Sequence, residues 1–179
     1  MDTQSNNLAT VPTAAQTPLA PFQPTYGGGI SDGFLAIFQP VVTPPALHVK
    51  YCTYLGINAQ ATVTGVAVDV AGNAYIVGYT SNPLGTLSTT NGFQTTYGGD
   101  PFDGFVMKLF PTGNGPGDLA YGTFLGGSGS DQALAIALDE QLPPLPPPLT
   151  VYVTGTSQSA NFPVTVTASG TIGAYQRPD

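Results

Sequence analysis

The segment "FQTTYGGDPFDGF", residues 93–105, repeats a segment that the chain has already used. The earlier copy, "FQPTYGGGISDGF", spans residues 22–34, so the shared residues return 71 positions later, as Phe22 does at Phe93. Self-similarity at a fixed distance is the signature of supersecondary units that bury a core only by packing on one another. The chain of 179 residues is therefore predicted to contain about two copies of one unit.

Further segments return in the same order along the chain. They are YCTYLG at 51–56 and YGTFLG at 121–126, VAVD at 66–69 and IALD at 136–139, AYIVGYT at 74–80 and VYVTGTS at 151–157, and GFQ at 92–94 with a weaker echo, AYQ, at 174–176. The second copy is longer because it carries the insert "EQLPPLPPPL" where the first copy has a short turn. Proline cannot donate to a sheet, so residues 141–148 are predicted to form a surface excursion outside the strands.

Each copy shows the alternation and the turn residues of four short strands. The segment "TGVAVDVAGNAYIVGYT" predicts a hairpin around Gly72 and Asn73, which both tolerate positive φ. "DGFLAIF" and "DGFVMKLF" are predicted to be strands opened by Asp-Gly turns, whereas "LHVKYCTYLG" and "LAYGTFLG" are predicted to be strands closed by glycine. A four-stranded antiparallel unit that recurs along a chain is typical of a β-propeller blade.

In chain order, these strands predict one whole blade flanked by two half blades. The expected pieces are a half blade at 34–40 and 47–55, a whole blade at 63–125, and a half blade at 134–139 and 150–156. We therefore expect an all-β domain at 21–179, with antiparallel repeats at about 22–92 and 93–175 and essentially no helix. Residues 1–20 lie outside the repeat, and their prolines favour an extended N-terminal arm.

The composition excludes several classes of partner. Charged residues make up 7% of the chain and the net charge is −7, with Lys50, Lys108 and Arg177 as the three basic residues, so neither nucleic acid nor anionic lipid is an expected partner. No apolar run approaches the roughly 20 residues of a membrane span, and the single Cys52 cannot form an intrachain disulfide. The scarcity of lysine and arginine favours an extracellular or cell-surface protein, although no secretory signal is visible.

The repeated segments resemble a known family. "YGTFLGGSGSD", "IALD" and "VYVTG" in one copy, with "VAVDVAGNAYIVGYTSN" and "FQTTYGG…DGFVMKL" in the other, are similar to the SBBP-type β-propeller repeat of bacterial and archaeal secreted or surface proteins. The resemblance covers about residues 20–176 and implies propeller blades without a defined enzyme activity. The chain departs from the pattern at "INAQAT", which replaces the "GGSGSD" loop in the first copy, and at the proline-rich insert.

Residues with catalytic chemistry do not form a recognisable site in the sequence. His48 has no Cys or His companions at metal-ligand spacing, and Cys52 takes the place of Gly122 in the repeat, which indicates a small packed residue. The segment "GGSGSD" lacks the lysine of a phosphate loop and predicts a turn, and no base is indicated for Ser128 or Ser130. No enzyme activity and no cofactor are therefore expected.

Four aspartates recur at equivalent positions of the two copies. Asp32 and Asp103 precede Gly-Phe, and Asp69 and Asp139 end the first strand of their hairpins. Carboxylates can bind calcium, but single aspartates without a D-x-D-x-D loop more simply form Asx turns. Both interpretations remain open from the sequence.

The two half blades are complementary, and this predicts the function. Open sheet edges are templates for pairing with another chain, so we expect the protein to self-associate head to tail into an extracellular filament or tube, with the arm docked on a neighbour. The predicted assembly interface contains Val11, Leu19, Phe22, Tyr26, Phe162 and Tyr175.

Other arrangements remain possible on the sequence alone. One is a secreted or surface binding module in a closed homo-oligomeric ring, in which aromatic residues such as Tyr26, Tyr97 and Phe102 hold a glycan or another cell-surface ligand. Another is a monomer whose own half blades pair into a two-sheet β-sandwich. An enzyme ranks last.

Overall fold

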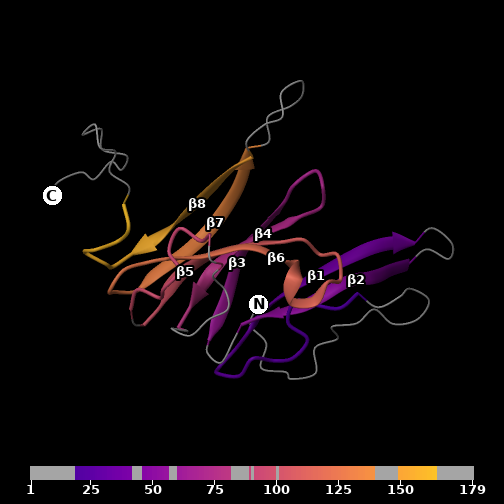
Figure 1. The fold of residues 1–179 in the computed structure, drawn as a ribbon, viewed down its shortest axis with the longest axis horizontal. Helices are drawn as coiled ribbons and strands as arrows, with labels where there is room; N and C mark the ends of the chain where they lie inside the picture. The colour runs from indigo at the N-terminus through magenta and orange to yellow at the C-terminus, as the bar shows by residue number, and fades with distance from the viewer. Residues whose placement is uncertain are drawn as a thin grey trace.

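The computed structural model describes residues 19–41, 46–56, 60–81, 89, 91–99, 101–139 and 149–164. Within these ranges the chain is all-β, and its one short helical segment is the 3₁₀ turn Gly115–Asp118. The strands are β1 (Gly33–Val41), β2 (Ala46–Leu55), β3 (Ala61–Val68), β4 (Ala74–Thr80), β5 (Asp103–Leu109), β6 (Leu119–Leu125), β7 (Asp131–Asp139) and β8 (Thr150–Ser157). The prediction of an all-β fold with essentially no helix is confirmed for the described residues (Figure 1).

The strands form three antiparallel sheets. The central sheet has the order β3-β4-β5-β6. A two-stranded sheet precedes it in the chain, β1-β2, and another follows it, β7-β8. Figure 1 shows the indigo β1-β2 pair and the orange β7-β8 pair on different sides of the central strands. One four-stranded sheet with a two-stranded sheet on either side is the strand pattern that the repeat predicts.

The glycines of the repeat serve two different purposes. Gly72 closes the β3-β4 hairpin with φ of 85°, as the sequence predicts. The predicted Asp-Gly turns are wrong, because Gly104 is a strand residue paired with Tyr79 on one side and Leu125 on the other. A Cβ at Gly104 would lie 2.9 Å from the Leu125 carbonyl oxygen of β6 and 3.1 Å from the Ala133 amide nitrogen of β7, so glycine is needed here for the close approach of both strands.

The first half blade packs against one face of the central sheet. A continuous core joins the two, with Leu35 and Leu55 on the β1-β2 side and Ile76, Phe105 and Met107 on the central side. Four of these five side chains are fully buried, and Leu35 is 9% exposed. This core holds β1-β2 in place although no strand of the central sheet is hydrogen-bonded to it within the described residues.

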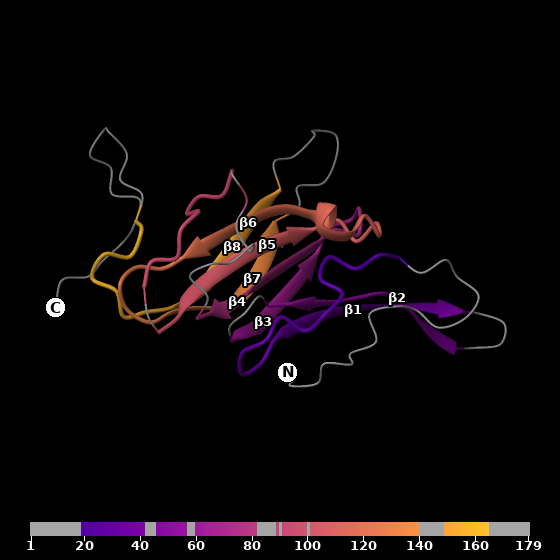
Figure 2. The same ribbon diagram turned by 60° about the horizontal axis from the view of Figure 1, so that its bottom comes forward.

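The last half blade packs against the opposite face of the central sheet. Val77 follows Ile76 in β4, so its side chain points to the other face. On that face a Cβ at Gly65 would lie 3.2 Å from Val77 and 3.3 Å from Ile136 of β7, and the Thr64 hydroxyl donates a 2.6 Å hydrogen bond to the Ala133 carbonyl. The central sheet therefore separates the two half blades, and the alternative in which they pair into a two-sheet sandwich is wrong (Figure 2).

Parts of three predicted segments lie outside the described residues. They are residues 1–18 of the arm, the insert at 141–148, and the tail from 165 onward. The described end of the arm contacts the β5-β6 connection, where Ala20 bridges to Asn114 and accepts a 3.3 Å hydrogen bond from the Gly115 amide. In the described part of the chain, no helix has the length and apolar character needed to cross a membrane.

Candidate functional site

The repeated Phe-Gln segment ties each loop to the last strand of its sheet. In the second copy, Gln94 donates from its backbone N–H to the Thr123 hydroxyl at 2.8 Å, and its side-chain carbonyl accepts from the Gly126 amide at 3.1 Å. In the first copy, Gln23 makes the same bonds to Thr53 at 2.8 Å and to Gly56 at 3.0 Å. These bonds explain why "FQ" recurs, since they give hydrogen-bond partners to backbone N–H groups that are buried or partly buried.

Asp32 and Asp103 hold the Tyr-Gly-Gly loops in the same way in both copies. The Asp32 carboxylate accepts a 2.6 Å hydrogen bond from the Gly27 amide, and Asp103 accepts one from Gly98. The donors lie five residues before the aspartate, so these are not the predicted Asx turns, in which the carboxylate accepts from an amide further along the chain. Both side chains are fully buried, and burial raises the pKa of each.

The second copy places a further carboxyl group beside Asp103. Asp131, at the start of β7, is also fully buried and accepts hydrogen bonds of 2.6 Å from the Gly127 amide and from the Ser159 hydroxyl. A Cβ at Gly126 would lie against both carboxyl groups. Burial, with the charge of Asp131, raises the pKa of Asp103 to about 6.

This pair was not predicted, because the sequence "GGSGSD" was interpreted only as a turn. The first copy has Ala61 at the position of Asp131, so Asp32 has no second carboxyl group at that position. The described residues contain no group of three or more His, Cys, Asp or Glu side chains able to hold a metal ion. Ca²⁺ takes six to eight oxygen ligands, so these two carboxyl groups would be only part of a calcium site.

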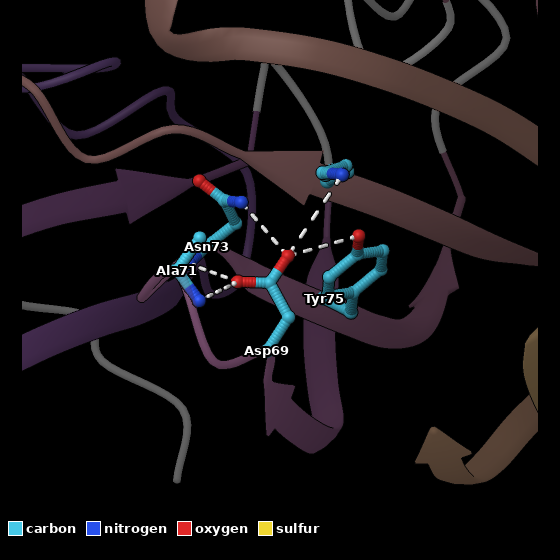
Figure 3. A network of polar contacts seen from close by, with 5 residues as sticks. Asp69, Ala71, Asn73 and Tyr75 are labelled. Atoms are coloured by element: carbon cyan, nitrogen blue, oxygen red, sulfur yellow. Dashed lines mark hydrogen bonds and ion pairs between the residues drawn. The ribbon is translucent and has the colours of Figure 1, made fainter. Parts of the chain in front are cut away.

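Asp69 forms the Asx turn that the sequence predicts. One carboxylate oxygen accepts from the amides of Ala71 at 3.0 Å and Asn73 at 2.9 Å, and the other from the Asn73 side chain at 2.8 Å and the Tyr75 hydroxyl at 3.2 Å (Figure 3). The Lys108 ammonium lies 3.9 Å from the carboxylate. Burial opposes ionisation, but these contacts outweigh it and hold the pKa of Asp69 below its ordinary value. Its counterpart Asp139 is exposed at the end of β7.

The candidate assembly surfaces are the open sides of β8 and β1. β8 occupies the place of β4 in the repeat, yet Tyr152 is 54% exposed whereas Tyr75 of β4 is 5% exposed. β1 occupies the place of β5, yet Phe38 is 56% exposed whereas Leu109 of β5 is fully buried. Within the described residues, each of these strands pairs with another on one side only. The structure therefore exposes two apolar strands whose repeat counterparts are buried.

Clefts run beside both open strands. A cleft of about 560 Å³ lies between the central sheet and β8, with Val106 and Tyr121 on one wall and Val151 and Val153 on the other. A smaller hollow of about 280 Å³ continues along β8 past Gly155. A third, of about 270 Å³, lies beside β1 and is lined only by apolar residues.

The structure places the residues predicted for the interface in different surroundings. Phe162 lines the hollow beside β8. Phe22 is 7% exposed in the core of its own chain, Leu19 packs against that core, and Tyr26 makes an edge-to-face contact with Tyr54 at 6.1 Å. The remaining two predicted residues, Val11 and Tyr175, lie outside the described ranges.

The other residues weighed in the sequence take part in packing. Tyr97 and Phe102 contact Phe124 and Tyr79 edge-to-face, at 5.9 and 5.3 Å between ring centres. Cys52 is 4% exposed in β2, and burial raises the pKa of its thiol. His48 lies in β2 opposite Gln39.

Comparison with known proteins identifies the repeat. Residues 50–85, which contain the end of β2 and all of β3 and β4, match the family model of the SBBP beta-propeller repeat. Over these residues the match agrees with the β-propeller-type repeat that the sequence resembles. No curated protein and no solved structure gives a significant match.

Proposed function

We propose that this protein is a structural subunit that self-assembles head to tail into an extracellular filament or tube, without enzyme activity. The observation that carries the proposal is the position of the half blades. β1-β2 supplies the last two strands of a blade, β7-β8 supplies the first two, and the central sheet keeps them apart. Among the described residues no further strand is left to complete either blade, so we propose that strands of a neighbouring copy complete them.

The chemistry of the open strands supports association with a neutral, apolar partner. The sequences of β1, GFLAIFQPV, and β8, TVYVTGTS, contain no charged residue. Exposed strand edges are normally protected by lysine, by bulges that twist the edge away or by inward-pointing charges. β1 and β8 carry no charge, although β1 has a bulge between Ile37 and Phe38 and a proline at Pro40. Burying their apolar side chains stabilises a contact by about 25 cal/mol per Å².

The arm has a role in the same proposal. An extended proline-rich segment can dock along a neighbouring subunit at low entropic cost, because proline limits the conformations that must be given up on binding. Leu19 and Ala20 contact their own chain, so the proposal concerns the arm before Leu19, which would dock on the adjacent subunit and reinforce the contact between blades.

A second candidate is a closed ring of subunits that acts as a binding module. The match to a β-propeller repeat favours it, because propeller blades close around an axis. A contact between different surfaces closes into a ring if its rotation permits and otherwise propagates as a helix. The two candidates share the contact and differ in its rotation.

Sedimentation velocity and electron microscopy of the purified chain test the proposal. Long polymers are expected, discrete rings would support the second candidate, and monomers at about 100 µM would contradict both.

Tyr152→Asp places a charge on the open strand and should abolish assembly. Val70→Asp, at a hairpin position that is 93% exposed, is the matched control and should leave assembly unchanged. Deleting residues 1–18, which keeps Leu19 and Ala20 on their own chain, should shorten the polymers while the far-ultraviolet circular dichroism stays that of a β protein.

A further inference from the structure

We infer that β8 pairs with β1 of a second copy of this chain in one antiparallel register, and that Phe34, Ala36 and Phe38 of that copy fill the cleft beside β8. The inference rests on the proposed function and specifies its contact at the level of residues. It follows from a complete example of the same contact inside the chain.

The pairing of β4 with β5 is that example. The two strands pair without interruption from Ala74 opposite Leu109 to Thr80 opposite Asp103. In the repeat, β8 corresponds to β4, and β1 corresponds to β5. The β7-β8 hairpin also reproduces the β3-β4 hairpin, including a bulge at the equivalent place, after Val63 in β3 and after Ala133 in β7. β8 therefore presents its open edge in the geometry that β4 presents to β5.

Transferring this register to the second copy fixes every pair. The pairs are Val151 with Phe38, Tyr152 with Ile37, Val153 with Ala36, Thr154 with Leu35, Gly155 with Phe34, Thr156 with Gly33, and Ser157 with Asp32. A shift by one residue would turn the apolar face of β1 away from the cleft, because side chains alternate between faces.

The core between β1-β2 and the central sheet shows which side chains are missing from the cleft beside β8. Between β1-β2 and the central sheet, the three β5 side chains Phe105, Met107 and Leu109 are fully buried. The equivalent space is the cleft of about 560 Å³ beside β8. The central sheet lines this cleft as β1-β2 lines the core on the other face. The lining residues Val106, Lys108, Tyr121 and Leu125 take the places of Leu35, Ile37, Tyr51 and Leu55 in the repeat.

β1 carries the side chains that correspond to the missing ones. Phe34, Ala36 and Phe38 stand at the positions of the three buried β5 residues, on the face of β1 that turns away from the central sheet of its own chain. Phe34 and Ala36 are only partly buried, and Phe38 is 56% exposed. Moving this face into the cleft of a second copy would give it the surroundings that β5 already has.

Glycine positions in the strands support the same placement. A Cβ at Gly78 of β4 would overlap the Thr62 carbonyl oxygen of β3 and would lie 2.8 Å from the Phe105 ring, so glycine admits the backbone of β3 and also leaves space for that ring. Gly155 of β8 takes the place of Gly78, and the atoms nearest a Cβ there come from the backbone of Gln132 and Ala133, with no ring among them. The adjoining hollow of about 280 Å³ lies where Phe34 of the second copy would sit.

The contact is reciprocal at the edge of β1. Tyr152 and Thr154 lie on the other face of β8 and are exposed. In the transferred register they would enter the hollow of about 270 Å³ beside β1 of the second copy, which Val63 and Val66 line. The β1 strand of the same chain cannot take this place, because the central sheet separates it from β8.

Disulfide trapping between single-cysteine chains tests the register. The background is Cys52→Ala, because Cys52 lies opposite Ala36 in the β1-β2 register and would compete for a disulfide. Four variants are made: Val151→Cys, Val153→Cys, Ala36→Cys and Phe38→Cys. Each β8 variant is mixed with each β1 variant, oxidised and run on a non-reducing gel.

Two of the four mixtures are in register. They are Val153→Cys with Ala36→Cys and Val151→Cys with Phe38→Cys. In each of them the two Cβ atoms lie about 4.5–5.5 Å apart, which is close to disulfide geometry. The two crossed mixtures separate them to about 7–8 Å. At least tenfold more cross-linked dimer is expected in register than across it. Every variant appears in one mixture of each kind, so a folding defect cannot produce this pattern.

Sedimentation of the same mixtures before oxidation separates the two levels of the proposal. Association with equal yields in all four mixtures, or with no cross-link in any, would overturn the register and leave self-assembly standing. Monomers in every mixture would overturn both.

Discussion

β4 and β8 are the same strand of the repeat in two different settings. Each closes a hairpin with the strand before it, and each carries a glycine at the same position, Gly78 and Gly155. β4 is buried along almost its whole length, whereas β8 is mostly exposed. The difference arises because β4 has β5 on its other side. Burial of a strand in this fold is thus decided by the neighbour that it receives and not by its own hairpin.

The largest loss of stability is expected in the core between β1-β2 and the central sheet, which the side chains of β5 fill. Phe105→Ala removes a fully buried ring and should lower the free energy of unfolding by about 3–5 kcal/mol. Phe34→Ala makes the same change on β1, where the ring is only partly buried, and should cost less than about 1 kcal/mol in the isolated chain. Urea unfolding of dilute monomers measures both. Equal costs would show that the open and the filled core do not differ.

A second comparison concerns the buried acids. The ordinary pKa of aspartic acid is 3.8, and that of Asp103 is raised to about 6. An acid with a raised pKa binds its proton more tightly in the folded state, so its contribution is complete below about pH 4 and is lost as the pH rises through about 6. The free energy of unfolding should therefore fall by about 2 kcal/mol between pH 4 and pH 7.

Asp103→Asn keeps a neutral side chain at that position and should flatten this dependence. Asp32→Asn, in the copy with Ala61 in place of the second acid, is the matched control and should flatten it less. Unfolding in urea at half-unit pH steps gives the slopes. A wild-type stability that rises from pH 4 to pH 7 would contradict the raised pKa.

The smallest effect is expected at the hairpin turns. Asp69→Ala removes the acceptor for the Ala71 and Asn73 amides and should cost about 1–2 kcal/mol. Asp139→Ala, at the exposed end of β7, should change stability by less than about 0.5 kcal/mol. Thermal unfolding at pH 7 resolves the difference, and equal shifts would mean that the Asp69 contacts add nothing in solution.

Local patterns in the sequence predicted the strands well. Alternation and the Gly72 turn identified all eight, because hairpins depend on neighbouring residues. The prediction of Asp-Gly turns was wrong for a tertiary reason. Gly104 lies within β5, and a side chain there would contact the backbone of neighbouring strands, including β7. The pairing of Asp103 with Asp131 was missed for a similar reason, because it joins two sheets. The sequence also could not show that the half blades occupy opposite faces of the central sheet.

That opposite placement has a consequence for how an assembly would grow. The two open strands differ from one another, so a single β8–β1 contact leaves one open β8 and one open β1 on every pair of copies, unless its rotation closes a ring. Each copy added at the β8 end presents a new β8, and each copy added at the other end presents a new β1. Such a polymer has direction and two chemically distinct ends, and a peptide with the sequence of β1 would block growth at one end alone.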